Sequence, residues 1–107
     1  MTTIEKIKQQ IKKNPIILYM KGSPSFPKCG FSAQAAKTLC SCGEKFAYID
    51  VLENLDIRTE LPKYANWPTF PQLWINEELI GGCDIITEMF INKKLQFLIK
   101  KTADKYR

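Results

Sequence analysis

One cysteine in this chain lies where a reactive thiolate forms most easily. Residues 21–32 read Lys-Gly-Ser-Pro-Ser-Phe-Pro-Lys-Cys-Gly-Phe-Ser and connect an apolar run at 16–20 to a helical pattern over 31–39. Cys29 is therefore expected at the mouth of a helix, where unpaired backbone N–H groups and the helix dipole stabilise negative charge. Lys28 adds a positive charge beside it, so we expect the pKa of Cys29 to be lowered.

The other cysteines limit the redox chemistry that this motif supports. A dithiol motif has a second cysteine three positions on, but here that position is Ser32, which can hydrogen-bond a thiolate but cannot close a disulfide. Cys40 and Cys42 lie at the far end of the expected helix, roughly 16 Å away at about 1.5 Å rise per residue. A disulfide tolerates Cα atoms only to about 7 Å apart. Because the chain has no histidine to complete a metal site, we expect both to be structural or incidental.

Three motifs relate the chain to a known family. The sequence Cys-Gly-Phe-Ser at 29–32, preceded by Lys21 and a long loop at 22–28, resembles the active site of the CGFS-type monothiol glutaredoxins. Trp-Pro-Thr-Phe-Pro at 67–71 and Gly-Gly-Cys-Asp at 81–84 resemble the two other segments of that family, in the same order. The resemblance covers essentially the whole chain and is closest to the single-domain bacterial form. It implies a thioredoxin-like α/β fold with Cys29 as the catalytic residue.

The resemblance also implies a glutathione site beside that cysteine. Lys21 and Arg58 are cations suited to a carboxylate, and in the family they hold the glycine carboxylate of glutathione. The segment that ends at Pro71 resembles a turn before a cis-proline. Such a turn leaves the N–H and C=O of Phe70 free to pair with the tripeptide.

Residues 82–84 complete this implied glutathione site. They offer backbone donors at a helix N-terminus to the γ-glutamyl carboxylate, while the Asp84 side chain can accept from the glutathione ammonium. Asp84 is also expected to N-cap that helix. Cys83 lies near the pocket in family members, so a backbone role and a reversible bond to Cys29 both stay open.

The ligand count predicts how a metal cluster could be held. A [2Fe-2S] cluster takes four ligands, normally thiolates. One chain offers Cys29 and one bound glutathione offers a second thiolate, so two chains with two glutathiones complete the set. CGFS glutaredoxins resembling this chain hold and transfer such clusters, alone or with a BolA-type partner. We therefore expect a monomer without the cluster and a homodimer with it, which passes the cluster to apo iron-sulfur acceptor proteins.

Two other functions remain possible for the same residues. A glutathione-dependent thiol-disulfide oxidoreductase would attack a mixed disulfide through Cys29 and be regenerated by glutathione. A redox-sensing adaptor would need no cluster. The carrier function is favoured because Ser32 removes the dithiol route and Phe31 replaces the tyrosine usual in dithiol motifs.

Apolar periodicity predicts the elements that position these groups. A first helix carries Ile4, Ile7 and Ile11 behind Thr2 or Thr3 as its N-cap, and Asn14-Pro15 ends it. The apolar runs at 16–20 and 46–50 flank the helix that begins at the motif, which Gly43 stops, and form a βαβ unit with parallel strands. A helix over 55–64, a β-hairpin from 72–75 and 79–82, a helix from 84 and a final helix follow. This order predicts a four-stranded mixed sheet flanked by helices, with an extra helix at each end.

Composition narrows the class of protein. The 107 residues are 45% hydrophobic, enough for one core, so we expect a single domain over 1–107. The formal net charge of +5 comes from lysines near both ends, which we interpret as solvated helix faces rather than a nucleic-acid surface. No run approaches the roughly 18 apolar residues of a membrane span. With no apolar signal region before Ile16, we expect a cytoplasmic protein with reduced thiols and no nucleic-acid or membrane partner.

Overall fold

Helices and strands follow one another along the chain in the order that periodicity predicts. The structure is a computed structural model that describes residues 1–107. Its elements are α1 (Thr3–Lys13), β1 (Ile16–Met20), α2 (Gly30–Ser41), β2 (Ala47–Asp50), α3 (Leu55–Ala65), β3 (Gln72–Ile75), β4 (Glu78–Gly81), α4 (Cys83–Ile91) and α5 (Lys94–Lys105). The predicted strands at 46–50 and 79–82 begin one residue away from their observed starts, because hydrogen bonding rather than apolar character sets a strand's limits.

The four strands form one mixed sheet in the order β2-β1-β3-β4. Strands β1 and β2 are parallel, which confirms the predicted βαβ unit, and β3 runs antiparallel to both β1 and β4. The β3–β4 hairpin turns at Asn76 and Glu77, whose φ angles of 51° and 67° are both positive. Two such residues in a two-residue loop match the right-handed twist of the strands they join.

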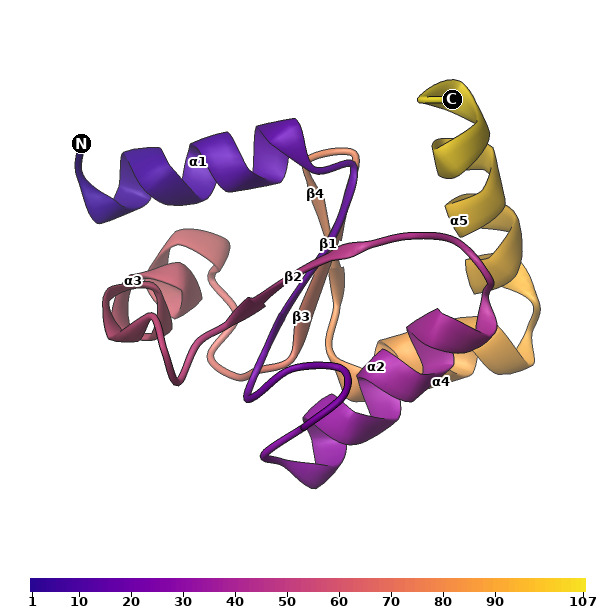
Figure 1. Cartoon of the computed structure of the whole chain (residues 1–107), viewed down its shortest axis with the longest axis horizontal. Helices are drawn as coiled ribbons and strands as arrows, with labels where there is room; N and C mark the ends of the chain where they lie inside the picture. Colours follow the sequence, from indigo (N-terminus) through magenta and orange to yellow (C-terminus); the bar gives the residue numbers. More distant parts are fainter.

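Helices cover both faces of this sheet, as Figure 1 shows with the sheet seen nearly on edge. Helices α1 and α3 lie on one side, and α2, α4 and α5 lie on the other. All five residues of β1 are buried, so that alternate side chains enter two separate cores. The predicted extra helix at each end of the chain is therefore part of a layer, α1 on one side and α5 on the other.

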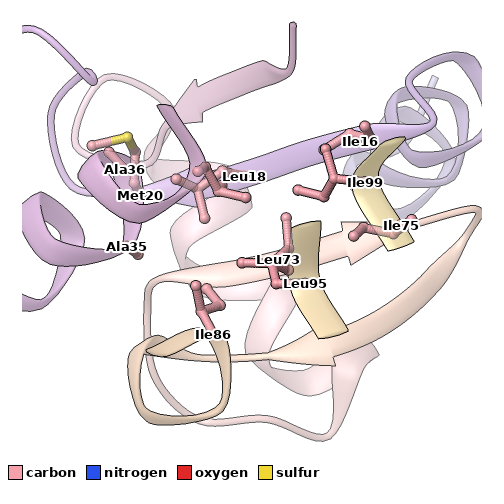
Figure 2. Packing of buried hydrophobic residues seen from close by; sticks show 11 residues of the cluster. Ile16, Leu18, Met20, Ala35, Ala36, Leu73, Ile75, Ile86, Leu95 and Ile99 are labelled. Carbon is pink, nitrogen blue, oxygen red and sulfur yellow. The ribbon is translucent and has the colours of Figure 1, made fainter. Parts of the chain in front are cut away.

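The two cores share the central strands. In the first, Ile16 and Leu18 of β1 pack with Leu73 of β3 against Leu95 and Ile99 of α5, as seen in Figure 2. The second core lies under α1 and α3. It contains side chains of α1, α3 and the intervening β1 residues, together with one residue of β3 and one that follows β2: Ile7, Ile11, Ile17, Tyr19, Val51, Ile57, Leu61 and Trp74. Burial on both faces holds β1 rigidly, and β1 ends directly at Lys21, where the motif begins.

Helix termini follow the local sequence. Thr2 is the N-cap of α1 and forms a capping box with Glu5, which decides between Thr2 and Thr3. Gly43 follows the end of α2 with φ +79°, a conformation that glycine adopts without a steric penalty.

No helix is both long enough and apolar enough to cross a membrane.

Candidate functional site

Cys29 is the N-cap residue of α2, in extended conformation with φ −154° and ψ 138°. Its side chain makes no capping hydrogen bond as a neutral thiol. When it ionises, the backbone N–H of Ser32 stabilises it most, and the N–H of Phe31 and the charge of Lys21 act in the same direction. Together they lower the pKa of Cys29 against the opposing effect of partial burial. The predicted activation of this thiol at a helix N-terminus is thus what the geometry produces.

The cation that acts on Cys29 is not the predicted one. Lys28 precedes Cys29 in sequence but is exposed, and it does not contribute to the lowered pKa, whereas Lys21 does. Lys21 is close because its backbone N–H donates to the buried Ser32 Oγ at 3.0 Å. A second hydrogen bond joins the two ends of the loop at 22–28, since the Lys28 N–H donates to the Lys21 carbonyl at 2.9 Å. A tertiary hydrogen bond, not sequence adjacency, therefore selects the cation.

The loop at 22–28 is an ordered hairpin. Gly22 pairs with Pro27 in an isolated antiparallel bridge, and Ser23 and Phe26 exchange backbone hydrogen bonds of 3.2 and 3.1 Å at its tip. Gly22 has φ +88°, and a Cβ atom there would lie 2.5 Å from the Phe26 carbonyl oxygen. Only glycine fits that position, so the base of the loop is sterically specified.

The turn before β3 contains the expected cis-proline. The Phe70–Pro71 peptide bond is cis. Neither the N–H nor the C=O of Phe70 takes part in a hydrogen bond within the chain. The buried Gln72 side chain holds this turn by donating from Nε2 to the carbonyls of Trp67, at 3.0 Å, and Thr69, at 3.3 Å. An extended ligand could therefore pair with Phe70 as a strand pairs with a sheet edge.

A single residue, Gly82, separates β4 from α4, and the N-terminus of α4 lies beside Cys29 and Phe70. Its N-cap is Gly82, so the expectation that Asp84 caps the helix is wrong. Asp84 lies in the first turn, where its carboxylate faces the positive end of the helix dipole. The first backbone bond of the helix is from the Ile86 N–H to the Gly82 carbonyl. The N–H groups of the preceding residues stay free for an anion.

Cys83 is buried beside Cys29 and differs from it in ionisation. Burial raises the pKa of the Cys83 thiol, as do the negative charges of Asp84 and Cys29, while a hydrogen bond from Thr87 acts against this. The two sulfurs are free thiols. Cys83 is therefore the neutral neighbour of an activated thiolate.

An open groove of about 520 Å³ joins these segments. It contains every residue that the sequence nominated: Lys21, Cys29, Arg58, Phe70, Cys83 and Asp84. Lys21, Arg58 and Asp84 make no ion pair within the chain, so both signs of charge are available to a ligand. Cys40 and Cys42 lie at the opposite end of α2, as expected.

Sequence reasoning did not assign several groove residues. Phe31, Pro62 and Trp67 also line it. The Trp67 indole Nε1 is buried with no hydrogen-bond partner, and it lies 3.5 Å from where a Cβ on Gly82 would stand. Trp67 belongs to the motif at 67–71, which could have indicated its place in the groove. Nothing in the sequence around Pro62, which lies inside α3, indicated that it lines the groove.

No group of three or more His, Cys, Asp or Glu side chains in the chain lies together in a way that could hold a metal ion. A metal ion bound through Cys29 would therefore need ligands from outside the chain.

Comparisons with known proteins agree with the motifs. A family model described as Glutaredoxin matches residues 16–80. "Glutaredoxin 4" of Escherichia coli (strain K12) is 68% identical over 106 residues, which are 99% of this chain and 92% of that protein. "Glutaredoxin 4" of Buchnera aphidicola from Acyrthosiphon pisum is 64% identical over 107 residues, 100% of this chain and 99% of that protein.

Solved structures show the same fold. The solution structure of reduced poplar apo GrxS14 superposes with a TM-score of 0.78 at 37% identity, covering 92% of this chain and 91% of that one. The crystal structure of a buckwheat glutaredoxin–glutathione complex superposes with a TM-score of 0.80 at 22% identity, covering 92% and 88%. These confirm the predicted thioredoxin-like fold.

Proposed function

The chain belongs to the glutaredoxin family, and from this premise we propose that it binds glutathione beside Cys29 and carries a [2Fe-2S] cluster shared with a second copy of itself. One observation supports this most directly. A single activated thiolate opens into a groove that supplies unpaired charges and free backbone groups, but no second activated thiol.

The groove matches the functional groups of glutathione. Glutaredoxins bind this tripeptide, which has two carboxylates, one ammonium and a peptide backbone. Lys21 and Arg58 suit the glycine carboxylate, and the free N–H and C=O of Phe70 suit the central cysteine residue. The N-terminus of α4 with Cys83 and Asp84 suits the γ-glutamyl end, where an anion meets N–H groups and the ammonium meets a carboxylate.

Two further features of the groove fit a bound peptide. The orphaned Trp67 Nε1–H is a donor that a folded protein rarely leaves buried without a partner. A Cβ at Gly82 would come within 3.3 Å of the Pro71 carbonyl oxygen, so glycine keeps open the space between the cis-proline turn and α4. A ligand lying across this space would contact both segments.

The cluster is proposed as cargo, held by ligands from four molecules. Cys29 and the sulfur of one glutathione supply two thiolates, and a second copy with its own glutathione supplies the other two. Because no side-chain group in the chain can close a metal site alone, separation of the two copies opens the ligand set. Transfer to apo iron-sulfur acceptor proteins, with or without a BolA-type partner, would follow that separation in a reducing compartment such as the cytoplasm.

A second candidate function uses the same thiolate as a nucleophile. The lowered pKa of Cys29 favours its attack on the glutathione sulfur of a mixed disulfide. This forms a Cys29–glutathione disulfide and releases the substrate as a thiolate, which takes up a proton. A second glutathione thiolate then attacks, giving glutathione disulfide and the free Cys29. Both functions need glutathione, but only the first needs a second copy of the chain.

Anaerobic reconstitution with iron, sulfide and glutathione tests the proposal. We expect a coloured dimer with about two iron atoms per pair of chains, followed by visible absorbance, iron analysis and size-exclusion chromatography. Colour and dimer should disappear in Cys29→Ser and when glutathione is omitted. Cys40→Ser, which removes an exposed thiol at the other end of α2, should behave as the wild type.

Two results would decide against the carrier function. A Cys29→Ser variant that still bound the cluster at full stoichiometry would refute the ligand assignment. A colourless wild-type monomer that reduces glutathionylated substrates would instead establish the oxidoreductase function.

A further inference from the structure

Gln72 is a fully buried polar side chain whose hydrogen bonds all serve one turn. It is the first residue of β3 and directly follows the cis-proline. Its Oε1 accepts from Trp74 Nε1 at 3.2 Å. An indole N–H can only donate, so the oxygen of the amide must face Trp74 and the NH₂ group must face the other way. That NH₂ group reaches the carbonyls of Trp67 and Thr69.

The turn at 67–71 has almost no other polar support. Within it, the one backbone hydrogen bond runs from the Trp67 N–H to the Pro62 carbonyl. The carbonyls that Gln72 binds belong to Trp67 and Thr69, and the Thr69 carbonyl is part of the peptide group that leads into Phe70. A single amide therefore sets where the Phe70 main chain lies. Because Trp74 and the β1 pairing with Tyr19 hold Gln72 in turn, the sheet interior fixes the position of the groove wall.

We propose that Gln72 is a positioning residue for the tripeptide ligand: it does not touch glutathione but fixes the Phe70 main chain in the geometry that pairs with it. This rests on the proposed function, since it assumes that glutathione occupies the groove. Loss of the amide donors leaves two buried carbonyls unpaired, and the turn then moves to find water.

Two substitutions at this position separate positioning from mere packing. Gln72→Met keeps the side-chain length but cannot donate at any pH. Gln72→Glu keeps the acceptor for Trp74 but places a carboxylate against two carbonyl oxygens. Burial raises the pKa of such a carboxyl, and once protonated it regains one donor. The Glu variant should therefore recover on acidification, whereas the Met variant should not.

The test measures the dissociation constant of S-methylglutathione by titration calorimetry. The sulfur of this ligand cannot react or bind a metal as a thiolate. At about pH 8 we expect both variants to bind about tenfold more weakly than the wild type, and near pH 5 the Glu variant should return to within about threefold. Far-ultraviolet circular dichroism and thermal unfolding of each variant check folding.

Other titrating groups are shared by all three proteins. Tyr19 faces Gln72 from β1, but burial, together with the nearby Tyr64, raises its pKa, so it stays neutral. Tyr64 stacks on Trp74, and the charged and thiol groups of the groove are Lys21, Cys29, Arg58, Cys83 and Asp84. The wild-type curve carries their contribution, so the difference between curves reports the introduced carboxyl.

Each outcome decides the question. Wild-type affinity in Gln72→Met, or a Glu variant that does not recover at low pH, would overturn the proposal. Loss of folding in both variants would also overturn it, because Gln72 would then be a general requirement of the fold. A wild-type protein that does not bind S-methylglutathione would refute the proposed function instead.

Discussion

At the scale of single residues, the lowered pKa of Cys29 comes mainly from its immediate backbone. The N–H groups of the first turn of α2 act on the thiolate most strongly, and the Lys21 charge adds to them. Because these N–H groups belong to the main chain, we expect most substitutions near Cys29 to leave its pKa lowered. Side-chain charges then adjust the effect.

Replacing Lys21 should slow the reaction of Cys29 with an alkylating agent, whereas replacing Lys28 should not. Lys21→Gln removes a charge that lowers the pKa of Cys29, so less thiolate is present near neutral pH. We expect a roughly two- to threefold lower rate with iodoacetamide at about pH 7. Above about pH 10, where an ordinary thiol is ionised, the difference should vanish.

Lys28→Gln is the matched control, because it removes the same charge from the residue next to Cys29 in sequence. Equal slowing in both variants would show that Lys28 acts on Cys29 as strongly as Lys21 does, and would contradict the assignment of this effect to Lys21 alone.

At the scale of elements, the site depends on three short segments that meet at one end of the sheet. The loop at 22–28, the turn at 67–71 and the N-terminus of α4 carry little regular structure of their own. Each depends on one residue: the loop on Gly22, the turn on the buried amide of Gln72, and the start of α4 on Gly82. Such segments tolerate fewer substitutions than their exposure suggests.

Gly22→Ala should destabilise the protein, whereas Gly30→Ala should not. A Cβ at Gly22 would collide with backbone atoms at 2.5 and 2.7 Å in a left-handed conformation, so the loop must open. We expect a loss of about 1–3 kcal/mol in urea unfolding. At Gly30 a Cβ would meet nothing within 4 Å, and alanine favours the first turn of α2. Similar unfolding midpoints for the two variants would contradict this account of the loop.

At the scale of the whole molecule, apolar packing on both faces of the sheet holds the layers together. Helix α1 covers one face through Ile7 and Ile11, both buried, and it also contacts α3 through the exposed Lys6–Asp56 ion pair. An exposed ion pair contributes little because water screens it and its side chains lose entropy. The packing of α1 is therefore expected to come from its isoleucines.

Ile7→Ala should cost far more stability than Lys6→Gln. The side chain of Ile7 is fully buried, so its truncation leaves a cavity and should lower the free energy of unfolding by about 2–5 kcal/mol. Lys6→Gln should change it only slightly. Urea denaturation of both variants at low and moderate salt makes the comparison, and an equal loss that disappears with salt would mean that charge, not packing, docks α1.

The sequence by itself determined the order of the elements, the parallel β1–β2 pair and which cysteine has a lowered pKa. These follow from short-range causes: apolar periodicity selects helix or strand, and a strand-to-helix turn places Cys29 at free N–H groups. The six nominated groove residues also lie together in the structure, although their spacing alone could not bring them together; the family motifs carried that information.

Only the tertiary structure decided which groups act on one another. Lys21 rather than Lys28 acts on Cys29, and its backbone is held there by a hydrogen bond to Ser32. Gly82 rather than Asp84 caps α4, at a position where a Cβ would lie only 3.3 Å from the Pro71 carbonyl oxygen. The supporting role of Gln72 was invisible in sequence for the same reason. The carbonyls that its amide binds are brought to it by the path of the turn, and no periodic pattern in a sequence predicts a buried amide.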